Sequence, residues 1–228
     1  MKIKAVLLDL DDTLWPVRPL LLHAEAALYE WMQVHVPSVA AAYSIEALRA
    51  RRQGLIASDP RFRYDLWALR HTVLSQVFVE HGEVAAKADS AMAVFAHARN
   101  QVSLYADVEP GLTQLARHVQ LGTISNGFAD LRAIGLARHF QVSLAAHQFG
   151  CAKPDARIFH AACAALALAP AEVLYVGDDL LLDVEGAQRA GLPAAWMNRS
   201  GIVSQERAHP QIRPELECRD LYDLLQLF

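Results

Sequence analysis

Two carboxylates near the start of the chain are placed where they could do chemistry together. Asp9 and Asp11 follow a short apolar run over residues 3–8. Side chains two residues apart in an extended segment point to the same side, so we expect both carboxylates to share one small space. Like charges that close need a cation or a proton to coexist. Mg2+ meets that need, because it prefers oxygen ligands and binds through a few carboxylates.

Two later segments carry groups that suit an anionic ligand. Ser125 and Asn126 offer a hydroxyl and an amide just before a helical pattern, where backbone N–H groups can cradle a phosphate. Lys153 precedes Pro154 at the start of another helical pattern, and its ammonium group can neutralise a phosphate as a point charge. Taken alone, the first segment is better explained as an ordinary helix cap and the second as a solvated loop lysine.

A second acidic group follows a glycine further along the chain. Gly177 ends an apolar run, and Asp178, Asp179 and Asp183 come directly after it. By itself this pattern is typical of a capped turn between a strand and a helix. Together, the acidic, hydroxyl and lysine segments agree in order and placement with one site.

The elements that must position these residues alternate along the chain. Short apolar runs over residues 3–8, 121–125, 173–176 and 194–197 predict buried strands. Helical patterns lie between them, over residues 111–119, 129–137, 156–168 and 181–190. This alternation predicts an α/β fold with a doubly wound, Rossmann-like parallel sheet. Ligands bind at the carboxyl ends of strands in such sheets, which is where the polar residues fall.

The stretch between the first strand and residue 103 has no strand-like run. It predicts about four amphipathic helices: one over 20–36 closed by Pro37, one capped by Ser44, one starting at Asp59 and Pro60, and one over 83–99. We interpret residues 16–102 as an all-helical cap inserted into a catalytic core of residues 1–15 and 103–228. Residues 198–213 are predicted to form a loop before a short C-terminal element.

Composition narrows the classes of protein. The formal net charge is −4, and the one short basic stretch, Arg49, Arg51 and Arg52, is interpreted as a solvated helix face, so no nucleic-acid partner is expected. No apolar run has the length of a membrane span. The three cysteines form no C-x-x-C pair, which argues against a disulfide framework or a zinc site and suits the cytoplasm. A monomer or a homodimer is expected.

These motifs together resemble the haloacid dehalogenase-like hydrolase superfamily, in particular its phosphatases with a helical (C1) cap. The resemblance rests on DLDDT at 9–13, Ser125-Asn126, Lys153 before Pro154, and GDDLLLD at 177–183. It implies that Asp9 attacks phosphorus to form an aspartyl-phosphate. Asp11 would protonate the leaving oxygen and then activate water, a general acid that becomes a general base.

The same resemblance assigns the remaining groups. Thr13 and Ser125 would bind phosphoryl oxygens, with Asn126 in the same loop, and Lys153 would offset the negative charge. Mg2+ would be held by Asp9, the backbone carbonyl of Asp11, and Asp178. Asp183 would orient these ligands without binding the metal itself, although direct contact by Asp179 or Asp183 stays open.

Three competing functions fit parts of the same pattern. A 2-haloacid dehalogenase uses the same first aspartate without a metal but lacks an acidic residue at the position of Asp11. A sugar phosphomutase would keep the aspartyl-phosphate and return it to a bound sugar, and a non-catalytic binding protein would use the fold alone.

The substrate is expected to be a small phosphomonoester from the flavin pathway or a nucleotide. Specificity is expected to come from the helical cap and from the segment that leads into it, residues 15–18, where Trp15 could stack on a planar leaving group or pack as a hinge residue. Arg61, Arg63 and Arg70 lie on or near the third predicted cap helix, and one of them could reach a substrate anion, but the favoured interpretation is a surface ion pair.

Overall fold

The computed structural model describes residues 2–202 and 209–228, which form two compact units. The first unit comprises Met1–Pro16, Ser103–Gly127 and Gly135–Phe228, and the second comprises Val17–Val102 and Phe128–Ile134. Part of the loop predicted over 198–213 falls on residues 203–208, outside the described residues. The second unit includes a short segment after Gly127 that the sequence pattern had placed in the core.

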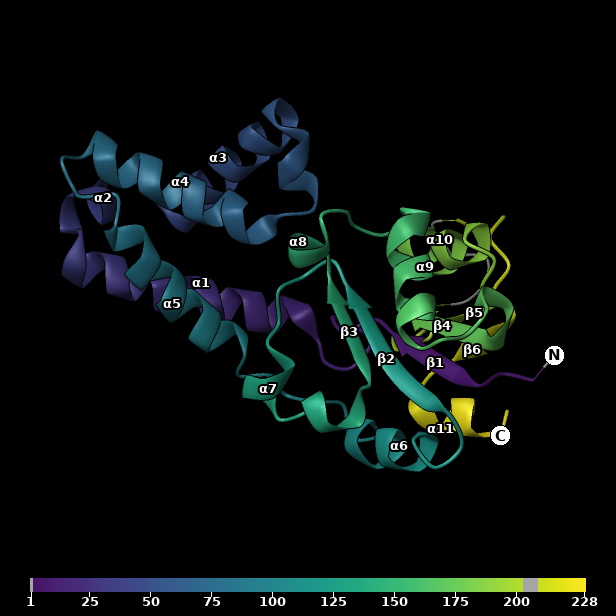
Figure 1. The fold of residues 1–228 in the computed structure, drawn as a ribbon. Coiled ribbons are helices and arrows are strands. Elements are labelled where there is room, and N and C mark those ends of the chain that lie inside the picture. The colour runs from purple at the N-terminus through teal and green to yellow at the C-terminus, as the bar shows by residue number, and fades with distance from the viewer. Residues whose placement is uncertain (1, 203–208) are drawn as a thin grey trace. The chain divides into compact units, whose positions relative to one another are not determined.

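The first unit is built on a parallel sheet of six strands (Figure 1). Their order is β3-β2-β1-β4-β5-β6, so β1 lies in the middle between β2 and β4. The strands are β1 (Ala5–Leu8), β2 (Gln120–Ser125), β3 (Val142–Ala145), β4 (Val173–Gly177), β5 (Ala194–Met197) and β6 (Leu216–Cys218). The predicted fold class, a parallel α/β sheet, is confirmed.

The two edge strands, β3 and β6, were not predicted from the sequence. Both are short, and their residues are largely half-buried or exposed, so neither presents a continuous apolar run. The four central strands are buried along most of their length, which is why their apolar runs are legible in the sequence.

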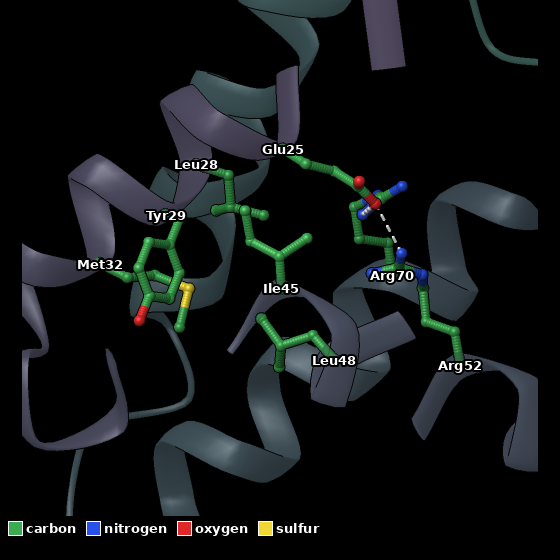
Figure 2. A pocket seen from close by; sticks show the side chains of 8 residues that line it. All are labelled: Glu25, Leu28, Tyr29, Met32, Ile45, Leu48, Arg52 and Arg70. Carbon is green, nitrogen blue, oxygen red and sulfur yellow. Dashed lines mark hydrogen bonds and ion pairs between the residues drawn. The ribbon is translucent and has the colours of Figure 1, made fainter. Parts of the chain in front are cut away.

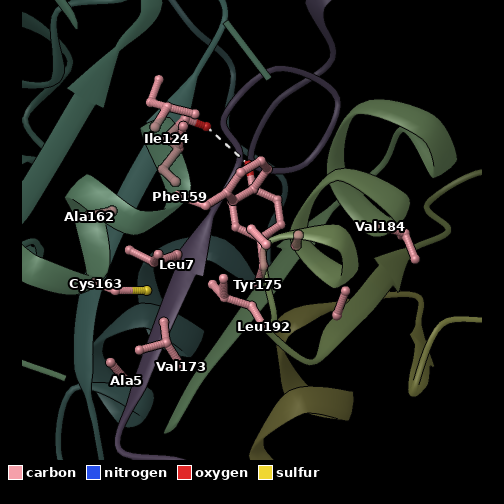
Figure 3. Close-up of a cluster of buried hydrophobic side chains, with 14 of the residues drawn as sticks. Ala5, Leu7, Ile124, Phe159, Ala162, Cys163, Val173, Tyr175, Val184 and Leu192 are labelled. Atoms are coloured by element: carbon pink, nitrogen blue, oxygen red, sulfur yellow. Dashed lines mark hydrogen bonds between the residues drawn. The ribbon is translucent and has the colours of Figure 1, made fainter. Parts of the chain in front are cut away.

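Helices of the first unit pack around this sheet. They are α6 (Val108–Leu115), α8 (Ala146–Phe149), α9 (Ala156–Ala165), α10 (Gly186–Arg189) and α11 (Leu221–Leu225). Helices α9 and α10 share a buried apolar cluster with the strands (Figure 3), in which Phe159 packs edge-on against Tyr175. The predicted helix over 181–190 is divided into a π-helical segment, Leu180–Glu185, and α10.

The second unit is entirely helical among its described residues. Its helices are α1 (Val17–His35), α2 (Pro37–Ala42), α3 (Ile45–Ser58), α4 (Leu66–Glu80), α5 (Lys87–Arg99) and α7 (Leu131–Ile134), with a 3-10 turn at Pro60–Arg63. A cluster of buried apolar residues from α1 to α5 forms its own core. Helix α7 belongs here because Phe128, just before it, contacts the rings of Trp67 and Phe95.

Local chain chemistry explains where these helices begin and end. Ser44 accepts a hydrogen bond from the Ala47 N–H at the start of α3, as predicted for an N-cap. The predicted third helix is instead two elements, because Asp59 caps only the 3-10 turn and Asp65 caps α4. The helix predicted over 129–137 is shortened to α7, since Gly135 adopts a positive φ of 89° that ends it. None of the described helices combines the length and apolarity needed to cross a membrane.

Candidate active site

Asp9 and Lys153 form the centre of the site. Asp9 directly follows β1, where its N–H donates to the Val176 carbonyl of β4 at 2.8 Å. The Lys153 ammonium group donates to Asp9 Oδ1 at 2.5 Å and to Asp183 Oδ1 at 2.6 Å. All three residues are buried, with exposed fractions of 6%, 5% and 1% for Asp9, Lys153 and Asp183. One buried cation is therefore shared by two buried carboxylates.

The position of Lys153 is fixed at both ends of the residue. The Asn126 side chain accepts from the Lys153 backbone N–H at 2.9 Å and donates to its carbonyl at 3.1 Å. At the other end, the ammonium group lies 2.9 Å from the Tyr175 hydroxyl, which is 3.2 Å from the Ile124 carbonyl (Figure 3). Asn126 thus links the loop after β2 to the loop that carries Lys153.

Tyr175 belongs to the site but was not predicted from the sequence. A signal was present, because a tyrosine in an otherwise aliphatic buried strand needs a partner for its hydroxyl group. Tyr175 is fully buried and its hydroxyl also lies 3.2 Å from Asp183 Oδ1. It is therefore a positioning residue for the Lys153–Asp183 pair.

Three carboxylates converge at the carboxyl ends of β1 and β4. Asp9, Asp178 and Asp183 each offer an oxygen, and these oxygens all lie within 4.8 Å of one another. Asp183 is held by the Asp179 N–H, which donates to its Oδ2 at 3.0 Å. Asp179 itself accepts from the N–H groups of the π-helical turn, so its side chain serves as an N-cap.

Gly177 makes this convergence sterically possible. A Cβ atom placed on Gly177 would lie 2.3 Å from Asp183 Cγ and 2.7 Å from its Cβ. These distances are far inside van der Waals contact, so any side chain at position 177 would displace Asp183.

The electrostatics of the cluster favour a bound cation. Burial raises the pKa of Asp9 well above its usual value, opposed by Lys153 and reinforced by Asp183 and Asp178. Burial, with the charges of Asp183 and Asp12, raises the pKa of Asp178 to about 7. Burial opposes the charged form of Lys153, but Asp183 and Asp9 outweigh it and raise the pKa of Lys153. A single ammonium group thus faces three carboxylates, a donor set that fits a hard divalent cation such as Mg2+.

The loop after Asp9 is folded back on itself. The Trp15 indole N–H donates to Asp11 Oδ1 at 2.7 Å, and Asp12 adopts a positive φ of 58°. The spacing in the sequence predicted that Asp9 and Asp11 would share one small space. In the structure the Asp11 carboxylate accepts a hydrogen bond from Trp15, and the carboxylates of Asp183 and Asp178 raise the pKa of Asp9. That Asp9 and Asp11 share one space stays a prediction.

Two buried hydroxyl groups accompany the carboxylates. Ser125 Oγ accepts from the Gly127 N–H at 2.9 Å. Thr13 is fully buried, and among the described residues its Oγ1 has no hydrogen-bond partner. An unpaired buried hydroxyl is costly, which makes Thr13 a candidate ligand-binding group.

Arg199 fixes the backbone of Thr13 and was not predicted from the sequence. Its guanidinium group donates to the Thr13 carbonyl at 2.8 and 3.1 Å and pairs with Asp107 at 2.7 Å. Arg199 and Thr13 are 186 positions apart, and nothing in the sequence near Arg199 indicates the contact. Arg199 also lines an open pocket of about 370 Å³ beside Asp12 and Asp178.

Comparison with models of protein families identifies the family of this chain. The model of the haloacid dehalogenase-like hydrolases matches residues 3–191. The chain therefore belongs to that family. The resemblance seen in the sequence motifs is therefore confirmed, and the protein is an enzyme of this family.

Two similar phosphatases match nearly the whole chain. One is the 5-amino-6-(5-phospho-D-ribitylamino)uracil phosphatase YigB of Escherichia coli, 31% identical over 99% of this chain and 96% of its own. Another is a phosphoserine phosphatase of Thermus thermophilus, 30% identical over 97% of both chains.

Solved structures of the family give a second comparison. A structure described as a 2-haloacid dehalogenase from Pseudomonas syringae has a TM-score of 0.91 and 35% identity, covering 99% of this chain and 97% of its own. A phosphatase of the same family from Thermococcus onnurineus has a TM-score of 0.71 and 25% identity, covering 99% of this chain and 97% of its own. The relatives thus include both the phosphatase and the dehalogenase chemistry that the motifs left open.

Proposed function

We propose that this haloacid dehalogenase-like hydrolase is a Mg2+-dependent phosphomonoester hydrolase with Asp9 as its nucleophile. The observation that carries the proposal is the buried cluster in which Asp9 meets Lys153 and the carboxylates of Asp178 and Asp183. Transfer of a phosphoryl group needs positive charge and positioned donors around one point more than any other feature. The cluster supplies both.

The reaction divides into two displacements at phosphorus. The Asp9 carboxylate attacks phosphorus, the bond to the leaving oxygen breaks, and Asp11 donates the proton that this oxygen needs. Asp11 then takes a proton from water, whose oxygen attacks phosphorus and releases phosphate and the Asp9 carboxylate. The Trp15 indole keeps Asp11 oriented for both steps, because it holds one carboxylate oxygen at 2.7 Å.

The phosphoryl oxygens would be bound by residues around the cluster. Thr13 Oγ1 is available as a donor, since it has no hydrogen-bond partner among the described residues. Ser125 and Lys153 would contribute a hydroxyl and an ammonium group, with Asn126 holding Lys153 in place. Thr13, Ser125 and Lys153 are all buried, so these hydrogen bonds would form away from water, where they are strongest.

Mg2+ fits the acidic donors of this chain. It would be held by Asp9, the backbone carbonyl of Asp11, and Asp178, with Asp183 orienting them through Lys153 and the Asp179 N–H. When bound, it neutralises charge on the phosphoryl group and on the attacking carboxylate. We propose Asp183 as an orienting residue rather than a ligand, because its two oxygens already accept hydrogen bonds from Lys153 and Asp179.

A 2-haloacid dehalogenase is the second candidate function, because the Pseudomonas syringae structure with that description is similar over nearly the whole chain. Two features favour the phosphatase. Asp11 offers the proton that an alkoxide leaving group requires and a halide does not, and the three-carboxylate cluster suits a metal. Halide release from a 2-chloro acid with EDTA present, and no phosphate release with Mg2+, would favour the dehalogenase.

The relatives suggest a class of substrate for this enzyme. We propose a small cytoplasmic phosphomonoester of the flavin pathway or a nucleotide, supported by the match to the E. coli ribitylaminouracil phosphatase. We also propose that the helical unit serves as the cap that selects it. A phosphate-release screen with Mg2+ tests this, using 5-amino-6-(5-phospho-D-ribitylamino)uracil, flavin mononucleotide, pyrimidine nucleotides, phosphoserine and p-nitrophenyl phosphate. Absence of turnover with every ester would contradict the proposed function.

A further inference from the structure

The helical unit contains a charged cluster that the proposed reaction does not use. Glu25 of α1 is buried, and its carboxylate accepts hydrogen bonds from Arg49 Nε at 2.9 Å and from Arg52 Nη2 at 2.7 Å. Arg70 of α4 lies against the same carboxylate, with Nη1 3.5 Å from Glu25 Oε1. The sequence predicted a solvated helix face and a surface ion pair for these arginines. The structure corrects these predictions for Arg52 and Arg70, which are largely buried, whereas the side chains of Arg49 and Arg51 are 40% and 36% exposed.

The charges in this cluster do not balance. Arg52 and Arg70 are largely buried against one buried carboxylate, which leaves an excess of one buried positive charge. Arg49, whose side chain is 40% exposed, adds a further positive charge at the edge of the cluster, 4.0 Å from the largely exposed Glu46. Glu25 stays ionised: burial works against it, but the hydrogen bond from Arg49 and the charges of Arg70 and Arg52 outweigh that and lower the pKa of Glu25. A buried excess of positive charge is unfavourable unless an anion compensates it.

Arg70 shows the imbalance most clearly. Its exposed fraction is 8%, and among the described residues its Nε and Nη1 atoms have no hydrogen-bond partner. Its guanidinium group lies over the Phe95 ring, with Cζ 3.8 Å from the ring centre. Burial, reinforced by the charge of Arg52, lowers the pKa of Arg70 to about 9. Arg70 is thus a fixed, buried donor with unused hydrogen-bonding capacity.

The cluster borders an open pocket of about 480 Å³. The pocket is lined by Val17, Arg18, Leu21, Leu22, Glu25, Arg49, Arg52, Gln53 and Arg70, all from the helical unit. Glu25, Arg52 and Arg70 also line a much smaller cavity of about 10 Å³, together with apolar residues such as Leu28, Ile45 and Leu48 (Figure 2). Only the larger of these two spaces has room for an anion of the size of phosphate.

We propose that this pocket, the arginine pocket, binds a small dianionic oxyanion such as phosphate or a phosphate ester. A dianion would compensate the excess buried charge of Arg52 and Arg70 and the partly exposed charge of Arg49. Planar guanidinium groups match the oxygens of such an anion in pairs. The proposal does not depend on the function of Asp9, because every lining residue belongs to the helical unit.

The test measures thermal stability of the whole protein against inorganic phosphate in EDTA, at constant ionic strength set with NaCl. Wild type is compared with Arg49→Gln, Arg52→Gln and the matched control Arg51→Gln, whose arginine neighbours the others on α3 but pairs with Glu80 outside the pocket. We expect phosphate to raise the melting temperatures of wild type and Arg51→Gln by the same amount. In the other two variants phosphate affinity should fall about tenfold to a hundredfold, as for loss of a hydrogen bond to a charged group. Any phosphate bound near Asp9 contributes equally to all four proteins.

Glu25→Gln gives an independent result of opposite sign. Removing the buried carboxylate leaves three arginines uncompensated, so the variant should melt below wild type in NaCl and gain more from phosphate than wild type does. The proposal is overturned if wild type gains nothing from phosphate beyond NaCl, or if Arg49→Gln and Arg52→Gln respond as wild type does. It is also overturned if Glu25→Gln gains no more than wild type. Assaying the same proteins with p-nitrophenyl phosphate and Mg2+ keeps failure here distinct from failure of the proposed function.

Discussion

Lys153 donates a hydrogen bond of 2.5 Å to Asp9, although 144 residues separate them in the sequence. The same ammonium group binds Asp183 at 2.6 Å, so the contact is one edge of a buried three-residue ion cluster. The arrangement ties the end of β1 to the loop before α9 and to the turn after β4. The stability and the proposed chemistry of the enzyme therefore depend on the same few charges.

Lys153→Met tests how much this cluster contributes to stability. Without the ammonium group, Asp9 and Asp183 would remain buried and uncompensated, so we expect the free energy of unfolding to fall by about 3–5 kcal/mol. Urea denaturation in EDTA measures the change. Lys4→Met is the matched control, since Lys4 pairs with Glu172 at the surface and should contribute about 1 kcal/mol or less. Equal losses in the two variants would contradict the account.

Tyr175→Phe removes the hydroxyl group that contacts Lys153 and keeps the ring that packs in the core. The ring should stay in place, because Phe159 packs against it edge-on at 5.0 Å, while the hydroxyl that holds Lys153 is lost. We expect kcat to fall about tenfold, the size of one hydrogen bond to a charged group, with little change in KM. Tyr222→Phe, at an exposed residue, should leave both constants unchanged. An unchanged kcat in Tyr175→Phe would remove Tyr175 from the positioning role.

Gly177→Ala should disable the site without disturbing the sheet elsewhere. The added methyl group would meet Asp183 at 2.3 Å and force it away from Lys153 and from the other carboxylates. We expect a large loss of activity and weaker stabilisation by Mg2+. Gly54→Ala, in α3, is the control: nothing lies within 4 Å of the added atom, so the replacement should be neutral or slightly stabilising. Full activity in Gly177→Ala would show that Asp183 need not stay where it is.

The raised pKa of Asp178 predicts how pH and Mg2+ act together. Between its ordinary pKa of 3.8 and its value of about 7 in the folded chain, the folded state holds a proton that the unfolded state has released. In EDTA, the contribution of Asp178 to the free energy of unfolding should therefore fall as pH rises through this window. Stabilisation by Mg2+ should increase over the same window, because the metal binds the ionised carboxylate. Melting temperatures across pH, with EDTA and with Mg2+, measure both effects.

Asp178→Asn is the control for this pH dependence. The amide does not titrate, so the variant should lose most of the stabilisation by Mg2+ and should be less sensitive to pH in EDTA than wild type. If Mg2+ stabilises Asp178→Asn as strongly as wild type, Asp178 is not a ligand.

The fold was predictable where burial leaves a periodic signal. The four central strands are covered on both faces, so their apolar runs appear in the sequence, and the motif residues follow at their carboxyl ends. The edge strands β3 and β6 carry no such signal because they are half exposed. The start of α3 was predictable because Ser44 caps it. The start of α4 was not, because Asp65 caps it within a stretch that the sequence pattern presents as one helix beginning at Asp59.

The site was predictable in the types of residue that carry its chemistry but not in its long-range contacts. Spacing suggested that Asp9 and Asp11 would share one space, but it gave no sign of the hydrogen bond from the Trp15 indole to the Asp11 carboxylate. Contacts between distant residues, such as Arg199 with the carbonyl of Thr13, leave no pattern in a single sequence. The arginines around Glu25 were misjudged for the same reason, since their common partner lies on another helix.

The central claim is that Asp9 carries the phosphoryl group. Asp11→Asn should still bind Mg2+ through its backbone carbonyl but should slow turnover by about 10²–10⁴-fold. With p-nitrophenyl phosphate the leaving group departs without a proton, so loss of Asp11 slows hydrolysis of the intermediate more than its formation, and the intermediate accumulates. The decisive measurement is mass spectrometry of Asp11→Asn quenched in acid during turnover of p-nitrophenyl phosphate with Mg2+. The account predicts one added phosphoryl group on the peptide that contains Asp9, absent when Asp9→Asn is combined with Asp11→Asn. Continued phosphate release by a protein carrying Asp9→Asn, or a phosphoryl group found on another residue, would contradict it.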